Sequence, residues 1–135
     1  MDTQNLPGHQ TDATVLVAED EGIVRLVLEE MLRKLGFRVL SATNGAEALN
    51  ALDASAQEVD LVIFDMTMPT MDGRQLFDRL QSAYPQAKTV LASGGGCEDE
   101  ISWMRSHGLS GFLPKPFSLG QVKKVLFDVL GYAEA

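Results

Sequence analysis

The sequence predicts an α/β fold: a doubly wound parallel sheet of five strands with five helices on its two faces. Three observations lead to this prediction. Short apolar runs alternate with segments whose apolar residues recur at helical spacing. The runs have the length and composition of strands that are buried on both faces, as in parallel sheets. The connections are short, so each strand and the following helix form one βα unit.

The first two units occupy the N-terminal part of this pattern. An apolar run at 15–18 ends in three acids, and a helical pattern then continues to Gly36, a residue type that commonly ends helices. A second strand is predicted over 38–42, and Asn44 and Glu47 have the spacing of a capping box that opens the second helix. The apolar positions of the first helix are Val24, Val27, Leu28, Met31, Leu32 and Leu35.

The third and fourth units follow the same scheme. The third strand is predicted over 59–64, and its apolar residues 61–64 lead directly into an aspartate. Residues 72–75 have capping-box spacing for a third helix. That helix is expected to end near 84–85, because a proline disfavours helical backbone in the residue before it. The fourth strand is predicted over 88–92, and the fourth helix over 98–107 after a glycine-rich turn.

The fifth unit completes the fold. A short strand is predicted over 111–113, and Pro114-Lys115-Pro116 forms a rigid turn after it. Capping-box spacing at 118–121 opens the last helix. The residues expected to face the core from this helix are Val122, Val125, Leu126, Val129 and Leu130.

Composition excludes several functional classes. The apolar fraction of 45% indicates a folded chain, and no apolar run approaches the roughly 20 residues that span a bilayer. The net charge of −8 argues against a nucleic-acid-binding surface and fits a domain that holds a cation or meets a basic partner. The single cysteine, Cys97, cannot form an internal disulfide and fits a reducing cytoplasm.

The chain shows one domain. Its 135 residues have no internal repeat, low-complexity tract or linker. We expect a disordered N-terminal arm at 1–12, a folded domain at 13–131 and a short C-terminal tail at 132–135. The polar beginning of the arm does not have the features of a secretory signal.

The polar residues that follow the predicted strands are expected to share one edge of the sheet. Ligands of open α/β sheets bind there, outside the carboxyl ends of the strands. These residues are Glu19, Asp20, Asp65, Ser93 and Lys115.

Three crowded carboxylates repel one another, and a divalent cation relieves that repulsion. Because all the candidate ligands are oxygen atoms, Mg²⁺ is favoured over zinc, with Glu19 and Asp20 holding it. A carboxylate is also a nucleophile towards phosphorus, so Asp65 is a candidate phosphoryl acceptor. Lys115 would supply a second positive group, and the Ser93 hydroxyl could hold phosphate oxygens together with the N–H groups of the glycine-rich turn.

Over roughly residues 13–131 the chain resembles the receiver (response-regulator) domains of two-component signalling, the CheY-like family. The resemblance implies the strand order 2-1-3-4-5. It rests on four motifs in the right order and spacing: Val-Leu-Val-Ala-Glu-Asp-Glu (15–21), Phe-Asp-Met-Thr-Met-Pro-Thr-Met-Asp-Gly (64–73), Leu-Ala-Ser-Gly (91–94) and Phe-Leu-Pro-Lys-Pro-Phe (112–117).

The resemblance implies a role for each residue of the acidic site. Asp65 would be the phosphoacceptor and a metal ligand. Asp20 would bind Mg²⁺ directly and Glu19 through water, and the backbone carbonyl of Thr67 would complete the protein's ligands. Glu19 stands where most relatives have Asp, so its carboxylate reaches one methylene further.

The resemblance also implies a switch. Lys115 would contact the phosphoryl group, and the Lys115–Pro116 bond would be cis. Ser93 would swing towards the phosphate, and Phe112 would be the aromatic switch residue, although it lacks the hydroxyl of the Tyr found in many relatives.

The implied function is a phosphorylation-dependent signalling switch. A histidine kinase or phosphotransfer protein would phosphorylate Asp65, and the face formed by the fourth helix, fifth strand and fifth helix would then bind a downstream protein or a fused output domain. The domain would catalyse its own phosphorylation and dephosphorylation, without turnover of an external substrate.

Three alternatives stay open. The chain could be a receiver cut from a hybrid histidine kinase or larger regulator, or a receiver-like module that works without phosphate. An aspartyl-phosphate phosphatase of the haloacid-dehalogenase type is disfavoured, because it needs a second Asp where this chain has Thr67.

Overall fold

The computed structural model describes residues 12–55 and 58–132. Its strands form one parallel sheet in the order β2-β1-β3-β4-β5, which confirms the predicted fold and strand order. The five strands are β1 (Thr14–Ala18), β2 (Arg38–Ala42), β3 (Leu61–Asp65), β4 (Lys88–Ser93) and β5 (Gly111–Pro114).

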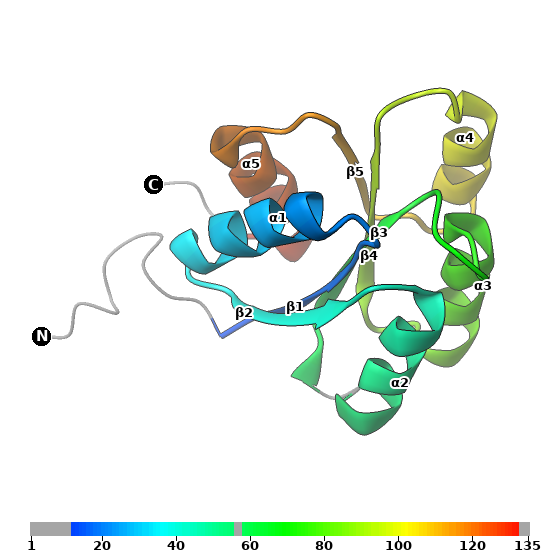
Figure 1. Ribbon diagram of the computed structural model, residues 1–135, viewed down its shortest axis with the longest axis horizontal. Coiled ribbons are helices and arrows are strands. Elements are labelled where there is room, and N and C mark those ends of the chain that lie inside the picture. The colour runs from blue at the N-terminus through cyan, green and yellow to red at the C-terminus, as the bar shows by residue number, and fades with distance from the viewer. Residues whose placement is uncertain (1–11, 56–57, 133–135) are drawn as a thin grey trace, which may run out of the picture.

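The helices cover both faces of the sheet (Figure 1). Helices α1 and α5 lie on one face, and α2, α3 and α4 lie on the other. This arrangement buries β1 and β3 completely, which explains their continuous apolar sequence. The helices are α1 (Gly22–Lys34), α2 (Gly45–Ser55), α3 (Gly73–Ala83), α4 (Glu98–Ser106) and α5 (Leu119–Leu130).

Two apolar layers fill the space between the sheet and the helices. One is built around Leu28 and Leu32 of α1 and Leu126 of α5, and the other around Phe77 of α3 and Met104 of α4. Because alternate residues of each strand point to opposite faces, the same strands supply both layers. The core-facing residues predicted in α5 all pack in the first layer, Val122 and Leu126 fully buried and the others partly.

The ends of the elements differ from the predictions by a few residues, and two of these differences matter. Asp65 and Ser93 are themselves the last residues of β3 and β4, so hydrogen bonding within the sheet fixes their backbones. Both predicted capping boxes of α3 and α5 are present. In α2, Asn44 accepts from the Glu47 N–H, but the Glu47 carboxylate reaches Thr43 instead of Asn44.

The predicted N-terminal arm lies outside the described residues except for Asp12, and the predicted tail except for Tyr132. The Tyr132 ring stacks on Phe37 and meets Phe127 edge to face, so it belongs to the first apolar layer. Among the helices that the structure describes, none has the length and apolar character needed to cross a membrane.

Candidate functional site

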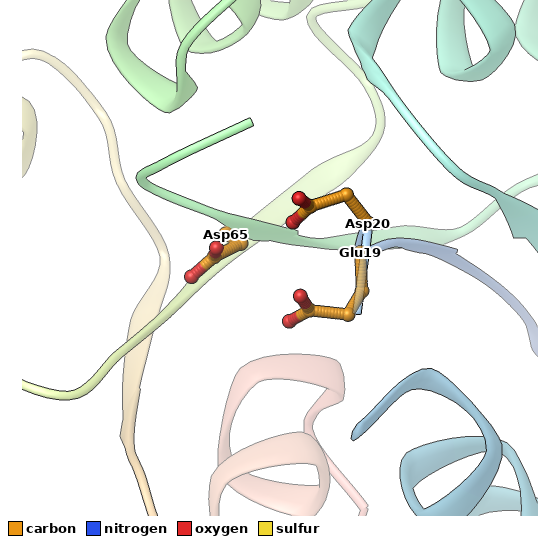
Figure 2. A group of neighbouring side chains, drawn as sticks. All are labelled: Glu19, Asp20 and Asp65. Atoms are coloured by element: carbon orange, nitrogen blue, oxygen red, sulfur yellow. The ribbon is translucent and has the colours of Figure 1, made fainter. Parts of the chain in front are cut away.

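Three carboxylates meet at the carboxyl ends of β1 and β3 (Figure 2). One oxygen from each of Glu19, Asp20 and Asp65 lies within 4.8 Å of the others. Glu19 and Asp65 are buried, with 3% and 9% of their surface exposed, whereas Asp20 is exposed. The acid run after β1 and the aspartate at the end of β3 come together because these strands are paired neighbours.

Lys115 reaches the same cluster from the turn between β5 and α5. Its Nζ donates to Glu19 Oε1 at 2.8 Å and to Asp65 Oδ1 at 3.1 Å. The Lys115 N–H donates to the Ser93 carbonyl at 2.8 Å, and the Lys115–Pro116 bond is cis, as the resemblance implies. The ammonium therefore bridges two acids from positions far apart in the chain.

Burial and neighbouring charges shift the pKa values of Glu19 and Lys115. Burial raises the pKa of Glu19, an effect that the Lys115 and Glu21 hydrogen bonds only partly oppose and that the nearby Asp65 charge strengthens. Burial alone would lower the pKa of Lys115, but its hydrogen bonds to Glu19 and Asp65 more than offset this, so its pKa is raised. The ammonium thus stays charged at neutral pH.

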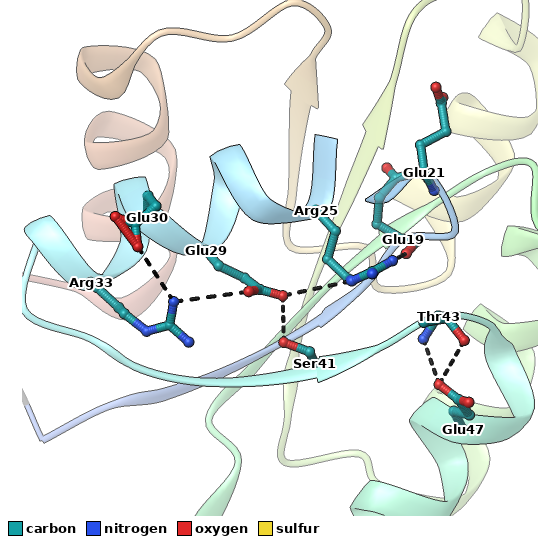
Figure 3. A network of polar contacts seen from close by, with 9 residues as sticks. All are labelled: Glu19, Glu21, Arg25, Glu29, Glu30, Arg33, Ser41, Thr43 and Glu47. Atoms are coloured by element: carbon teal, nitrogen blue, oxygen red, sulfur yellow. Dashed lines mark hydrogen bonds and ion pairs between the residues drawn. The ribbon is translucent and has the colours of Figure 1, made fainter. Parts of the chain in front are cut away.

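The main chain of Glu19 is also fixed, by a hydrogen bond to its carbonyl oxygen (Figure 3). Arg25 in the first turns of α1 donates from Nη1 to the Glu19 carbonyl at 2.8 Å, and the Glu21 N–H donates to the Glu19 carboxylate at 3.1 Å. Glu29, only 7% exposed, lies 3.8 Å from Arg25 Nε and accepts a hydrogen bond from Ser41. Our sequence predictions did not include Arg25, because its contact reaches back against the direction of the helix.

The loop after Asp65 is tightly packed. A Cβ on Gly73 would lie 2.7 Å from the Asp65 carbonyl oxygen and 2.7 Å from Met66 Cα, both backbone atoms that cannot move aside. The Gly73 N–H donates to the Met66 carbonyl at 2.7 Å. Thr70 has a φ of 65°, which is rare for a β-branched residue. Thr67 lies in this loop with an exposed side chain, two residues after Asp65.

Ser93 and Phe112, the two predicted switch residues, lie on neighbouring strands. Ser93 is 5% exposed, and its Oγ lies 3.0 Å from Cys97 Sγ and accepts a hydrogen bond from the Gly95 N–H at 3.3 Å. Phe112 is half-buried against the second apolar layer. The Ser93–Cys97 contact could be suspected from the four-residue spacing, but it depends on how the glycine-rich turn folds.

The site fits a Mg²⁺ ion. Its converging ligands are all carboxylate oxygens, one of the three acids is open to water, and Mg²⁺ prefers oxygen ligands and retains water molecules. The pKa of Glu19 is raised mainly by burial, and the nearby Asp65 charge adds to this rise.

An apolar surface borders the site. It consists of Ile23, Leu26 and Val27 of α1 and Leu119 of α5, whose exposed fractions are 80%, 59%, 45% and 39%. Val27 belongs to the predicted apolar positions of the first helix but faces outward. A groove of about 330 Å³ joins this surface to Lys115 and is lined by Ile23, Val24, Val27, Lys115, Pro116 and Phe117.

Comparison with known proteins gives a consistent result. The family model described as "Response regulator receiver domain" matches residues 15–127. The chain is 37% identical to the sensor kinase CckA of Brucella abortus over 118 residues, which are 87% of this chain and 12% of the kinase. It is 32% identical to the transcriptional regulatory protein GlrR of Escherichia coli, covering 90% of this chain and 27% of that protein.

Solved structures share the fold. A crystal structure of a CheX–CheY complex with BeF3 and Mg²⁺ from Borrelia burgdorferi has a TM-score of 0.83 at 24% identity, covering 87% of this chain and 89% of that one. The chain thus spans only a small part of the curated relatives named above, but nearly the whole of this compact structural neighbour.

Proposed function

The chain belongs to the response regulator receiver domain family, and from that premise we propose that it is a phosphorylation-dependent switch with Asp65 as phosphoacceptor. The observation that carries the proposal is the Lys115 ammonium, which bridges Asp65 and Glu19 beside the acidic cluster. Phosphoryl transfer needs mainly positioning and charge neutralisation, and this arrangement offers both.

In the proposed reaction, a carboxylate oxygen of Asp65 attacks the phosphorus of a phosphohistidine or of a small phosphodonor. The new P–O bond forms as the bond to the donor nitrogen or oxygen breaks, and the leaving group takes that electron pair. Lys115 already donates to Asp65 Oδ1, so a small displacement lets its ammonium follow the incoming phosphoryl oxygens. Hydrolysis by water later returns Asp65 and inorganic phosphate.

Glu19, Asp20 and Asp65, together with the backbone carbonyl of Thr67, are the residues that we propose hold Mg²⁺. When bound, this ion neutralises charge on the transferring phosphoryl group. Glu19 is fixed for this role by Arg25 and the Glu21 N–H. Asp20, the exposed member, leaves one side of the cluster open to water.

We propose that the protein donor of the phosphoryl group, a histidine kinase or phosphotransfer protein, docks on the apolar surface of Ile23, Leu26, Val27 and Leu119. Transfer requires the donor histidine to reach Asp65, and the groove joins this surface to Lys115, which contacts Asp65. Ile23→Glu should slow labelling by a purified phosphorylated donor protein and leave labelling by acetyl phosphate unchanged. An equal loss with both donors would contradict this docking site.

The output of the switch is proposed to run through Ser93 and Phe112. Ser93 ends β4, and Phe112 lies in the neighbouring strand β5, where it pairs with Leu91, two residues before Ser93. A displacement of Ser93 towards a phosphoryl group would therefore change the space near Phe112. Such a displacement would alter the face formed by α4, β5 and α5, which would bind the downstream protein or output domain.

The test is Mg²⁺-dependent phosphorylation by labelled acetyl phosphate. Wild type and Asp72→Asn should take up label, whereas Asp65→Asn should not. Asp72→Asn is the matched control, because it makes the same chemical change seven residues away and Asn caps helices as well as Asp does. Equal labelling of all three would contradict the assignment of Asp65, and no labelling of wild type would favour a receiver-like module that works without phosphate.

A further inference from the structure

Cys97 has a place in this structure that the proposed function does not use. It is the N-cap residue of α4, it is 7% exposed, and its side chain makes no capping hydrogen bond to the helix. Its sulfur instead lies 3.0 Å from the Ser93 hydroxyl oxygen, a contact buried between the end of β4 and the start of α4. Within the part of the chain that the structure describes, the Cys97 sulfur pairs with the side chain of Ser93, the proposed switch residue.

The Ser93 hydroxyl has few ways to satisfy its hydrogen bonds. Its oxygen accepts from the Gly95 N–H at 3.3 Å, and a serine hydroxyl offers a single proton to one acceptor at a time. At 5% exposure the hydroxyl is largely shielded from water. Either Ser93 or Cys97 can be the donor of their contact, and in both cases the Ser93 hydroxyl lies against the sulfur.

We propose that Cys97 is a positioning residue that holds Ser93 in its phosphate-free orientation and so opposes the switch. The Ser93–Cys97 hydrogen bond exists in one of the two states only, because a Ser93 hydroxyl that turns to a phosphoryl oxygen leaves the sulfur. An interaction made in one state alone shifts the equilibrium towards that state. This inference rests on the proposed role of Asp65.

The sulfur atom determines how strongly Cys97 would oppose the switch. A thiol is a weak hydrogen-bonding partner, so it can satisfy Ser93 without competing strongly against a charged phosphoryl oxygen. Removing it leaves the buried hydroxyl with less compensation in the phosphate-free state and does not affect the phosphate-bound state to the same degree. Loss of the thiol should therefore make activation easier.

The test measures binding of beryllofluoride with saturating Mg²⁺ by fluorine NMR in four proteins: wild type, Cys97→Ala, Cys97→Val and Cys97→Ser. The Ala and Val variants should bind at about twofold to fivefold lower concentration, the lower part of the range for one neutral hydrogen bond. Val fills the space without a polar group, so it separates loss of the partner from a cavity. The Ser variant keeps a partner and should return to the wild-type midpoint.

The single cysteine provides a direct spectroscopic readout, because the S–H stretching band of the protein arises from Cys97 alone. The band should shift when beryllofluoride and Mg²⁺ are added to wild type. It should already be shifted in Ser93→Ala, and should not respond there.

Equal midpoints in wild type, Ala and Val, or an S–H band unchanged by beryllofluoride, would overturn the role of Cys97. So would a lowered midpoint in Ala that Val reverses, because that pattern belongs to a cavity. If wild type and Asp65→Asn alike show no bound beryllofluoride, the proposed function fails instead, so the two failures can be told apart.

Discussion

The acidic side of the site, at β1 and β3, and the Ser93 side, at β4, differ in how strongly their polar groups are fixed. On the side of β1 and β3, Glu19 receives hydrogen bonds at its carboxylate from Lys115 and Glu21 and at its carbonyl from Arg25, and a glycine seals the loop after Asp65. On the side of β4, the Ser93 hydroxyl has a thiol and one N–H at 3.3 Å as partners.

The segments beyond these residues differ in the same sense. Gly94, Gly95 and Gly96 have open space where a side chain would stand, and Gly95 and Gly96 have positive φ values. Charged contacts and close packing fix the groups that would carry out the chemistry. Weak contacts hold the buried hydroxyl that would move, and the turn that follows it has open space around its glycines. This difference implies that substitutions on the two sides affect different properties, labelling and stability on one and the switch equilibrium on the other.

The largest effect is expected at the fixed side, from Lys115→Met. Loss of the ammonium removes the donor to Asp65, and we expect labelling by acetyl phosphate to slow by roughly a hundredfold, as for other preorganised charge-stabilising groups. Lys88→Met is the matched control, because it removes the same charge from the start of β4, at the end of the strands that lies away from the site. Equal labelling rates for the two variants would show that Lys115 acts only through net charge.

The same Gly→Ala change should separate the two sides by stability. Gly73→Ala forces a methyl group against two backbone atoms and should cost about 2 kcal/mol in the free energy of unfolding, the middle of the range for overpacking. Gly94→Ala meets no atom within 4 Å and should change it by less than about 0.5 kcal/mol. Urea unfolding of both variants measures the free energy of unfolding. An equal loss in Gly94→Ala and Gly73→Ala would contradict the difference in packing between the two sides.

A smaller effect, on Mg²⁺ affinity, is expected from Arg25→Gln. Loss of the hydrogen bond to the Glu19 carbonyl should weaken Mg²⁺ binding by about tenfold, as removal of a group that orients a metal ligand does. Calorimetric titration with Mg²⁺ measures the affinity. The control Lys34→Gln removes the same charge from the end of α1, and a similar weakening there would assign the effect to charge alone.

The smallest effect is the acid dependence of stability without Mg²⁺. The folded-state pKa of Glu19 is raised, so its protonation stabilises the fold; this contribution is complete below the ordinary pKa of glutamate and is lost as pH rises through the raised value. Glutamine has no carboxyl group to ionise, so Glu19→Gln does not lose this contribution. As pH rises through this window, the free energy of unfolding of Glu19→Gln should therefore increase relative to that of wild type. Chemical unfolding at a series of pH values tests this, with the exposed Glu30→Gln as the variant that should show no such trend.

The strands and the acidic cluster could be predicted because they rest on signals that are local or topological. Buried parallel strands must be apolar along their length, and the ends of such strands must share one edge, so Glu19 and Asp65 could be brought together without coordinates. The caps of α3 and α5 were predictable for a similar reason, since a capping box closes within four residues.

The contacts that support the site depend on geometry that residue spacing alone does not determine. Arg25 turns back along α1 to a carbonyl outside the helix, and the Ser93–Cys97 contact needs the glycine turn to fold in one particular way. The outward face of α1 did carry a signal. Five of the six residues at 23–28 are apolar, more than one helix stripe can bury, so part of them had to remain exposed.

That exposed face has a consequence for partner selection. Contact between apolar surfaces is not directional, so Ile23, Leu26 and Val27 can stabilise many complexes to a similar degree. Discrimination between correct and incorrect partners must then come from charges at its border, where a mismatch is penalised. Glu30 and Lys34 have this position, because they line the neighbouring groove on α1 together with Leu26. If the donor docks on this face as proposed, exchanging their charges should change which donor is accepted and preserve the chemistry at Asp65.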